Sequence, residues 1–243
     1  MRLFLAASNS KQYLTEELKE SLYILESYYY FKSWQRPLLK SCRSFLLDSG
    51  AFTFMSSTKG ETPDWNRYIK GYIDFINLYE IDLFFELDID AIVGYEQVKQ
   101  MRKKIEAGTG KQCIPVWHRS RGAQEYIRLC DEYPYIAIGG FAIKDIKSNE
   151  YNQIIPLLDK AFAKGTKVHG LGFTPPELLK YPFYSVDSSS WTSGSRYASV
   201  YSFCNGRMTL ARKRSNQRLI NYKALDRHNL AQWLKYQKYL DKE

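Results

Sequence analysis

The sequence predicts an α/β protein built as a (β/α)8 barrel, in which parallel strands alternate with helices. Three observations support this prediction. Short apolar runs alternate with amphipathic segments along the chain, most of the runs end in an aspartate, a histidine or a glycine, and no glycine-rich phosphate-binding loop follows the first run. Parallel neighbours need a connection long enough to return to the same end of the sheet, so this order implies helical crossovers.

Seven runs have the length and apolar character of strands: Arg2 to Ala7, Phe45 to Asp48, Leu83 to Asp88, Ile114 to His118, Tyr135 to Gly140, Val168 to Gly172 and Tyr184 to Asp187. An eighth strand is less evident. The segment 199–211 has Asn205-Gly206 at its centre, which favours a hairpin with a tight turn over a final strand and helix. We therefore expect a barrel that is irregular at its last strand.

The segments between these runs carry apolar residues every three or four positions, as helices packed on a sheet do. A helical pattern covers 14–31 and opens with Thr15 and two glutamates. Another helix is expected to begin near Thr62-Pro63-Asp64, with threonine at the cap and proline in the first turn. Further helices are expected at about 95–107, 121–133, 150–164 and 225–240, and a short one after the capping-box spacing of 174–177.

Polar residues and glycines close successive runs, and this placement favours a barrel. They are Asp48, Asp88, His118, Gly139-Gly140, His169 or Gly170, and Asp187. In a closed barrel the carboxyl ends of all strands converge on one mouth, where catalytic groups of such barrels lie. In an open doubly wound sheet, which remains the alternative, only the strands beside the crevice would meet.

The chain of 243 residues is long enough for a single barrel domain over 1–243, with 199–243 as a basic extension packed on it. The formal net charge is +9. From Arg207 onward ten Lys and Arg stand against three Asp and Glu, so a net +7 lies in this extension. Such a stretch suits a polyanion such as nucleic acid, although a solvated basic helix explains the charge equally well. The candidate contacts to a nucleic-acid backbone are Arg207, Arg212, Lys213, Arg214 and Arg218.

No apolar stretch approaches the roughly 18 residues of a membrane helix, and the apolar run near the N-terminus is too short for a signal peptide. We therefore expect a cytoplasmic protein without a membrane partner. The four cysteines, Cys42, Cys113, Cys130 and Cys204, are far apart and form no CxxC pair. This spacing predicts four free thiols and neither a metal site nor a cofactor.

Four short motifs resemble those of the tRNA-guanine transglycosylases, in the same order and at similar spacing between residues 45 and 195. Asp48-Ser49-Gly50-Ala51-Phe52 resembles their DSGGF segment, and Ile138-Gly139-Gly140-Phe141-Ala142 resembles GGLAVG. Val168-His169-Gly170-Leu171-Gly172, followed by Thr174-Pro175, resembles LMGVGTP. Tyr184-Ser185-Val186-Asp187-Ser188 stands where the family carries the aspartate of DCVxPTR.

The resemblance implies a barrel enzyme that removes guanine from a polynucleotide and inserts a 7-deazapurine. Asp187 would be the nucleophile on the anomeric carbon of the sugar, and Asp48 the general acid and base. This agrees with the chemistry of N-glycosidic bonds, because one carboxylate can capture the positive charge on the sugar while a second group handles the proton of the leaving base. By analogy with retaining glycosidases, the two carboxyl groups should lie about 5 Å apart.

The same resemblance assigns the residues that bind the base. Asp88 would accept hydrogen bonds from the guanine edge, with Asp90 as a plausible substitute. The amides of Gly139 and Gly140 would hold the carbonyl oxygen of the base. His118 stands near a base-contacting glutamine of the family, and the substrate-binding set also includes Gly170.

Departures from the family pattern bear on the nucleic acid. The chain has no CxCxxC zinc site, and Ser188-Ser189-Ser190-Trp191 replaces the PTR that follows the nucleophile. A shortened, zinc-free chain with a basic tail resembles the DNA-modifying branch found in bacteriophages and genomic islands, which exchanges guanine in DNA for a deazaguanine. The expected partners are thus guanine-containing DNA and a small deazapurine base, with the target base flipped out of the duplex or single-stranded.

Two other functions remain open at this point. A DNA glycosylase would use the same aspartates but let water take the sugar, and a non-catalytic barrel would bind nucleic acid through its basic tail. The site residues also have structural explanations, since Asp48 could form a local turn and Asp187 could cap a helix. Trp191 and Tyr197 could stack on a flipped base, although core packing is expected for at least one of them.

Overall fold

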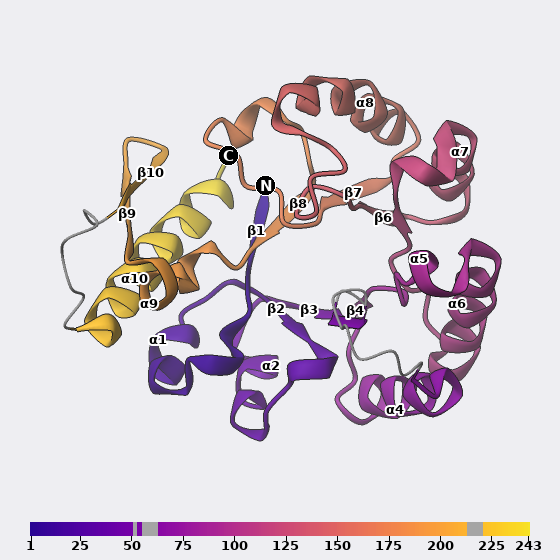
Figure 1. The fold of residues 1–243 in the computed structure, drawn as a ribbon, viewed down its shortest axis with the longest axis horizontal. Helices are drawn as coiled ribbons and strands as arrows, with labels where there is room; N and C mark the ends of the chain where they lie inside the picture. Colours follow the sequence, from indigo (N-terminus) through magenta and orange to yellow (C-terminus); the bar gives the residue numbers. More distant parts are fainter. Residues whose placement is uncertain (51–52, 55–62, 213–220) are drawn as a thin grey trace.

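Eight parallel strands form the centre of the computed structural model, which describes residues 1–50, 53–54, 63–212 and 221–243 (Figure 1). The strands are β1 (Arg2–Ala6), β2 (Tyr23–Ser27), β3 (Ser44–Asp48), β4 (Leu83–Phe84), β5 (Val116–Trp117), β6 (Tyr135–Ile138), β7 (Lys167–Gly170) and β8 (Ser185–Ser188). They pair in the order β4-β3-β2-β1-β8-β7-β6-β5, and every pairing is parallel.

The two edge strands, β4 and β5, are joined by a parallel bridge between Phe85 and Ile114. The Ile114 N–H donates to the Phe84 carbonyl over 2.8 Å, and the Glu86 N–H donates to the Ile114 carbonyl over 3.1 Å. This bridge closes the sheet, so the predicted (β/α)8 fold class is confirmed. The barrel is least regular here, where both strands are two residues long, whereas the last strand, β8, pairs with β1 over four residues.

Strand β2 lies inside the segment 14–31, for which the sequence pattern predicts a helix, and that prediction is wrong. Apolar residues at helical spacing also fit a short strand preceded by irregular turns. Tyr23 and Leu25 pack inside the barrel, while Ile24 between them packs in the outer core, which is the period of two of a strand. Only one turn of α-helix, α1 (Thr15–Leu18), forms ahead of β2.

Helices lie around the outside of the barrel (Figure 1). They are α1, α2 (Leu38–Ser41), α4 (Trp65–Leu78), α5 (Asp90–Val93), α6 (Tyr95–Thr109), α7 (Gly122–Glu132), α8 (Ile155–Ala163), α9 (Ser193–Tyr197) and α10 (Tyr222–Leu240). The cap of α4 is Asp64, whose carboxylate accepts from the Arg67 N–H over 3.1 Å. The sequence placed that cap at Thr62, which lies outside the described residues. After 174–177 only a 3-10 turn forms, at Leu178–Lys180.

The predicted hairpin is confirmed. Strands β9 (Ser199–Cys204) and β10 (Arg207–Arg212) pair antiparallel, and both turn residues have positive φ, 49° at Asn205 and 75° at Gly206. Positive φ at both positions is what a tight two-residue hairpin turn needs. The hairpin contacts α10 beside the barrel (Figure 1).

Helix α10 covers β1 and β2 from outside. The buried side chain of Gln237 donates to the carbonyls of Leu3 and Tyr23, each over 2.8 Å, and accepts from the Leu22 N–H over 2.6 Å. Near the other end of the helix, buried Asp226 pairs with Lys11 over 2.7 Å. The C-terminal segment therefore supplies the outer helix next to β1.

Alternation along the strands divides the core into two layers. Phe4, Leu46, Phe85, Val116 and Ala137 are among the residues that fill the barrel interior. The intervening strand residues pack outward against the helices. The carboxyl ends of the strands are left for polar groups, as the sequence pattern indicated.

Candidate active site

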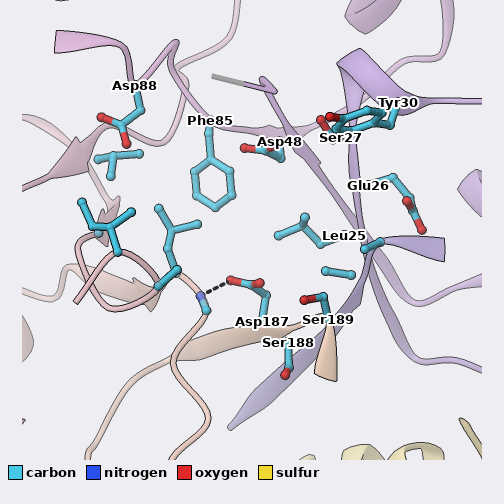
Figure 2. A pocket seen from close by; sticks show the side chains of 18 of the residues that line it. Leu25, Glu26, Ser27, Tyr30, Asp48, Phe85, Asp88, Asp187, Ser188 and Ser189 are labelled. Carbon is cyan, nitrogen blue, oxygen red and sulfur yellow. Dashed lines mark hydrogen bonds between the residues drawn. The ribbon is translucent and has the colours of Figure 1, made fainter. Parts of the chain in front are cut away.

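A cavity of about 430 Å³ lies at the carboxyl ends of the barrel strands. This volume is within the range of pockets that hold small molecules. Asp48, Asp88 and Asp187 line it and lie around the ring of Phe85 (Figure 2). His118, Gly139 and Gly140 also line it, so the predicted catalytic and base-binding residues other than Gly170 share one cavity.

Asp48 closes β3 and has a raised pKa. Burial raises the pKa of this carboxyl to about 6, with further contributions from the charges of Asp187 and Asp88, while the hydrogen bond from the Gly50 amide offsets part of the rise. That amide donates to Oδ2 over 3.0 Å. Asp48 therefore also forms the local turn that the sequence offered as the alternative to a catalytic role. Such a carboxyl can both give and take a proton near neutral pH.

Helix α4 holds both the residue after Asp48 and the segment after β4. The Tyr68 hydroxyl donates to the Ser49 carbonyl over 2.6 Å, and the Tyr72 hydroxyl donates to the Phe85 carbonyl over 2.9 Å. Both tyrosines come from one face of α4, and Tyr72 is fully buried. The helix thereby fixes β3 and the segment after β4 relative to each other.

Asp187 lies within β8 and is 9% exposed, so it does not cap a helix. Its Oδ1 accepts from the Gly172 N–H over 2.7 Å, which is the dashed contact in Figure 2, and lies 3.2 Å from His169 Nε2. Both contacts come from β7 and the loop after it. The carboxylate is therefore held on one oxygen at the wall of the cavity.

Asp88 lies after β4 and is held by two basic groups. His118 Nε2 is 2.6 Å from Oδ2 and 2.8 Å from Oδ1, and the Arg121 guanidinium donates to Oδ1 over 3.1 Å. Burial lowers the pKa of His118, but the hydrogen bond and charge of Asp88 outweigh the burial, and the net shift is upward. A ligand that binds to the Asp88 carboxylate would therefore lie next to the His118 ring.

Arg121 is the site residue that the sequence did not indicate. Its side chain is 1% exposed and bridges three carboxylates, donating to Glu86 over 2.8 Å and to Asp88 and Asp90 over 3.1 Å each. Its guanidinium carbon also lies 4.2 Å from the centroid of the Tyr95 ring. Asp90, proposed as a substitute for Asp88, is bound by Arg121 and is not among the cavity-lining residues.

The glycines of the predicted set differ in role. The Gly139 N–H donates to the Trp117 carbonyl over 2.9 Å, so this amide serves strand pairing. The prediction that it holds the carbonyl oxygen of the base is therefore wrong. A Cβ at Gly139 would lie 2.5 Å from Cε1 of His118, which explains the glycine. Gly140 remains as a cavity-lining member of the pair. Gly170 does not line the cavity and packs against Phe173 and Phe183 instead.

Two further sequence predictions concern aromatic and basic residues. Trp191 is fully buried and donates from Nε1 to the Ala6 carbonyl over 2.8 Å, so it belongs to the core and does not stack on a base. Tyr197 is 68% exposed. Arg207 and Arg212 are exposed on β10. The other three basic candidates, Lys213, Arg214 and Arg218, lie outside the described residues.

Glu26, at the rim of the cavity, was missed because β2 was predicted as a helix. It is 2% exposed, and burial raises its pKa to about 7 against the opposing hydrogen bonds from Ser8. Its carboxylate turns away from the three aspartates (Figure 2). The aromatic and branched run Tyr23-Ile24-Leu25 between Ser21 and Ser27 was the signal that could have revealed the strand.

Asp88, Asp90 and His118 bring possible metal-ligand atoms within 4.8 Å of one another. However, the Arg121 guanidinium already lies on both carboxylates and supplies the positive charge there. All four cysteines have free thiols, as predicted. Within the part of the chain that the structure describes, no helix is both long and apolar enough to cross a membrane.

Comparison with known proteins adds little to this site. No protein-family model and no curated protein matches the sequence. Among solved structures, the chain is similar to a complex of a GH113 β-1,4-mannanase, with 10% sequence identity, a TM-score of 0.40 and coverage of 69% of this chain and 70% of that chain. We draw no functional argument from this distant likeness.

Proposed function

We propose that this protein is a base-exchange enzyme that cleaves the N-glycosidic bond of guanine in DNA and inserts a 7-deazaguanine derivative. The observation that carries the proposal is the gathering of Asp48, Asp88 and Asp187 around one cavity. The three carboxyl groups differ in surroundings, since Asp48 is half-buried with a raised pKa, Asp88 is bound by basic groups and Asp187 is held by an amide and an imidazole. Three different tasks follow from these three environments.

In the first step the Asp187 carboxylate attacks the anomeric carbon, and the bond between that carbon and N9 of guanine breaks. Protonated Asp48 gives its proton to the departing base, so guanine leaves as a neutral molecule and Asp48 becomes a carboxylate. The sugar remains attached to Asp187 as an ester. A pKa of about 6 leaves a usable fraction of protonated Asp48 at neutral pH.

In the second step the roles reverse. The deazaguanine occupies the position that guanine has left, and the Asp48 carboxylate takes its N9 proton. The nitrogen then attacks the anomeric carbon and displaces Asp187. Charge and protons balance, because both aspartates return to their starting states.

Asp88 is the group suited to recognise guanine. Its carboxylate can accept hydrogen bonds from N1–H and from the exocyclic amino group, and both donors are absent from adenine at these positions. Arg121 donates to Oδ1 of Asp88 and holds this carboxylate in place, with its own side chain only 1% exposed. His118 contacts both oxygens of Asp88 and orients this carboxylate, whose remaining lone pairs can accept from the base.

The basic hairpin supports DNA as the carrier of the guanine. A groove of about 460 Å³ shares Gly172 with the site cavity and includes Arg207 of β10 in its wall. A backbone in this groove would run from the nucleophile to the exposed arginines, where phosphates are neutralised. The anomeric carbon of a stacked nucleotide is out of reach, so the target nucleotide has to be flipped out or single-stranded.

The decisive experiment combines labelled guanine with trapping of the intermediate. DNA and RNA hairpins of one sequence are incubated with the protein and radiolabelled guanine, and incorporation and covalent adducts are followed on denaturing gels. We expect label and adduct with DNA, and neither with Asp187→Asn. Asp159→Asn, an exposed aspartate on α8, is the matched control and should behave like the native chain.

Other outcomes identify the alternatives. Abasic sites without incorporation would mean hydrolysis, and label in RNA alone would make RNA the substrate. DNA binding without either reaction in the native chain would reduce the protein to a nucleic-acid-binding barrel. An adduct that persists in Asp187→Asn would remove Asp187 from its assigned role.

A further inference from the structure

We infer that His169, Ser185 and Tyr135 form a hydrogen-bonded relay inside the barrel that selects Oδ2 of Asp187 as the attacking atom. The inference rests on the proposed function for its catalytic meaning, while the relay itself follows from contacts within the barrel. Neither the resemblance nor the sequence pattern assigned a task to these three residues as a set.

The relay is a continuous series of contacts through three neighbouring strands. His169 Nε2 lies 3.2 Å from Oδ1 of Asp187, and His169 Nδ1 lies 2.6 Å from the Ser185 hydroxyl. That hydroxyl is in turn hydrogen-bonded to the hydroxyl of Tyr135. His169 and Ser185 are paired across β7 and β8, which places them at the same level of the barrel.

Chemistry fixes the direction of these bonds. An ionised carboxylate only accepts hydrogen bonds, so His169 donates from Nε2 to Asp187. In the neutral ring Nδ1 then accepts from Ser185, and the Ser185 oxygen accepts from Tyr135. Every donor in the series thus has an acceptor, and the ring has a single consistent tautomer, with its proton on Nε2.

The surroundings allow His169 little freedom. Its side chain is completely buried, and its ring lies 5.3 Å from the Phe85 ring and 5.9 Å from the Phe4 ring, measured between centroids. Ser185 is also completely buried and Tyr135 is 8% exposed. Buried polar groups need their hydrogen-bond partners, so rotation of the ring would leave several of them unpaired.

The consequence is a difference between the two oxygens of Asp187. Oδ1 accepts from both His169 and Gly172, whereas Oδ2 has no hydrogen-bond partner among the described residues. Oδ2 therefore keeps its lone pairs for the anomeric carbon. In the ester, Oδ1 becomes the carbonyl oxygen and retains both donors, which then stabilise the carboxylate as it leaves in the second step.

His169 is accordingly a positioning residue, and its variants separate positioning from packing. His169→Met removes the donor but keeps an apolar side chain of similar volume, and His169→Gln restores an N–H near the position of Nε2. We expect His169→Met to lower the exchange rate at saturating substrate at least tenfold without changing guanine affinity. His169→Gln should recover most of that loss, and His228→Met, at an exposed histidine of α10, should lose nothing.

A spectroscopic measurement tests the relay without using activity. The ¹⁵N resonances of the His169 ring in the native chain at pH 8 report which nitrogen carries the proton. We expect a protonated Nε2 and an unprotonated Nδ1, and removal of the Ser185 hydroxyl by Ser185→Ala should shift the Nδ1 signal. A ring protonated on Nδ1, or a His169→Gln variant as slow as His169→Met, would overturn the relay. A native chain with the expected tautomer but no exchange activity would instead reject the proposed function.

Discussion

The backbone N–H of Gly172 donates to Oδ1 of Asp187 over 2.7 Å, so the loop after β7 holds the carboxylate that β8 presents. Gly172 has φ of +67°, in the left-handed region. A Cβ added at this position would contact only Ala142, at 3.5 Å. A side chain at position 172 would therefore destabilise the protein through the strained backbone conformation and not through a steric clash.

Gly172→Ala should therefore destabilise the protein by about 1–2 kcal/mol and move the amide away from Asp187. Gly165→Ala is the matched control, because Gly165 has φ of +73°, open space around its Cβ position and no part in the cavity. Urea unfolding should show similar losses for both variants, and adduct formation should fall only in Gly172→Ala. Equal adduct rates would contradict the role of this amide.

Asp48 should make the protein less stable as pH rises from about 4 to about 6. Its pKa is raised from 3.8 to about 6, so in this range the folded chain keeps a proton that the unfolded chain has released. Asp48→Asn removes this titration. The variant should be more stable than the native chain at pH 7, by at most about 3 kcal/mol, and the difference should vanish below pH 4. Urea unfolding at several pH values measures it, and an Asp48→Asn variant that is less stable at pH 7 would refute the assignment.

Arg121→Met should destabilise the fold by about 3–5 kcal/mol, because it leaves Glu86, Asp88 and Asp90 without their shared positive charge in a buried setting. Arg128→Met provides the comparison. Arg128 pairs with two carboxylates as well, but its side chain is 39% exposed, so the loss should stay below about 1 kcal/mol. Similar losses in the two variants by urea unfolding would show that burial of Arg121 is not decisive.

Gly139→Ala should weaken guanine binding by displacing His118, since the added Cβ would lie 2.5 Å from the imidazole. The effect should depend on His118. In a double-mutant cycle with His118→Ala, we expect a coupling energy of about 1 kcal/mol or more. Calorimetric titration with guanine gives the four affinities, and additive losses would mean that Gly139 acts through something other than this ring.

Arg207→Ala and Arg212→Ala should weaken DNA binding without regard to sequence. Each removed phosphate contact should reduce the slope of log affinity against log salt concentration by about one. Fluorescence anisotropy between low and moderate salt measures this slope. Lys103→Ala, at an exposed lysine on α6, should leave it unchanged, and an unchanged slope in the hairpin variants would exclude the hairpin from the interface.

The sequence predicted those parts of the fold that depend on local patterns. The strand ends that carry Asp48, His118 and Asp187 follow from apolar runs, and the hairpin follows from Asn205-Gly206. Strand β2 was missed because Leu14, Leu18, Leu22 and Leu25 recur at helical spacing across it. Pairing with β1 and β3 decides for the strand. Glu26 was not predicted as a cavity residue because it lies on that strand.

The other features of the site that the sequence did not predict depend on contacts between residues far apart in the chain. Arg121 meets carboxylates 31 to 35 positions earlier in the chain, and nothing around it marks it as more than the first residue of a helical segment. The Gly139 amide was expected to face a ligand, yet its orientation depends on Trp117 of the neighbouring strand. Likewise, the relay joins residues of three strands whose register only the folded barrel defines.

The side chain of Gln237 bonds to backbone groups at positions 3, 22 and 23, and this has a consequence for biosynthesis. The outer face of the first two strands stays uncovered until residue 237 has left the ribosome. Contacts between residues so far apart in the chain slow folding, and the apolar outer face of these strands stays exposed until the contacts form. We therefore expect the nascent chain to depend on chaperones until α10 docks.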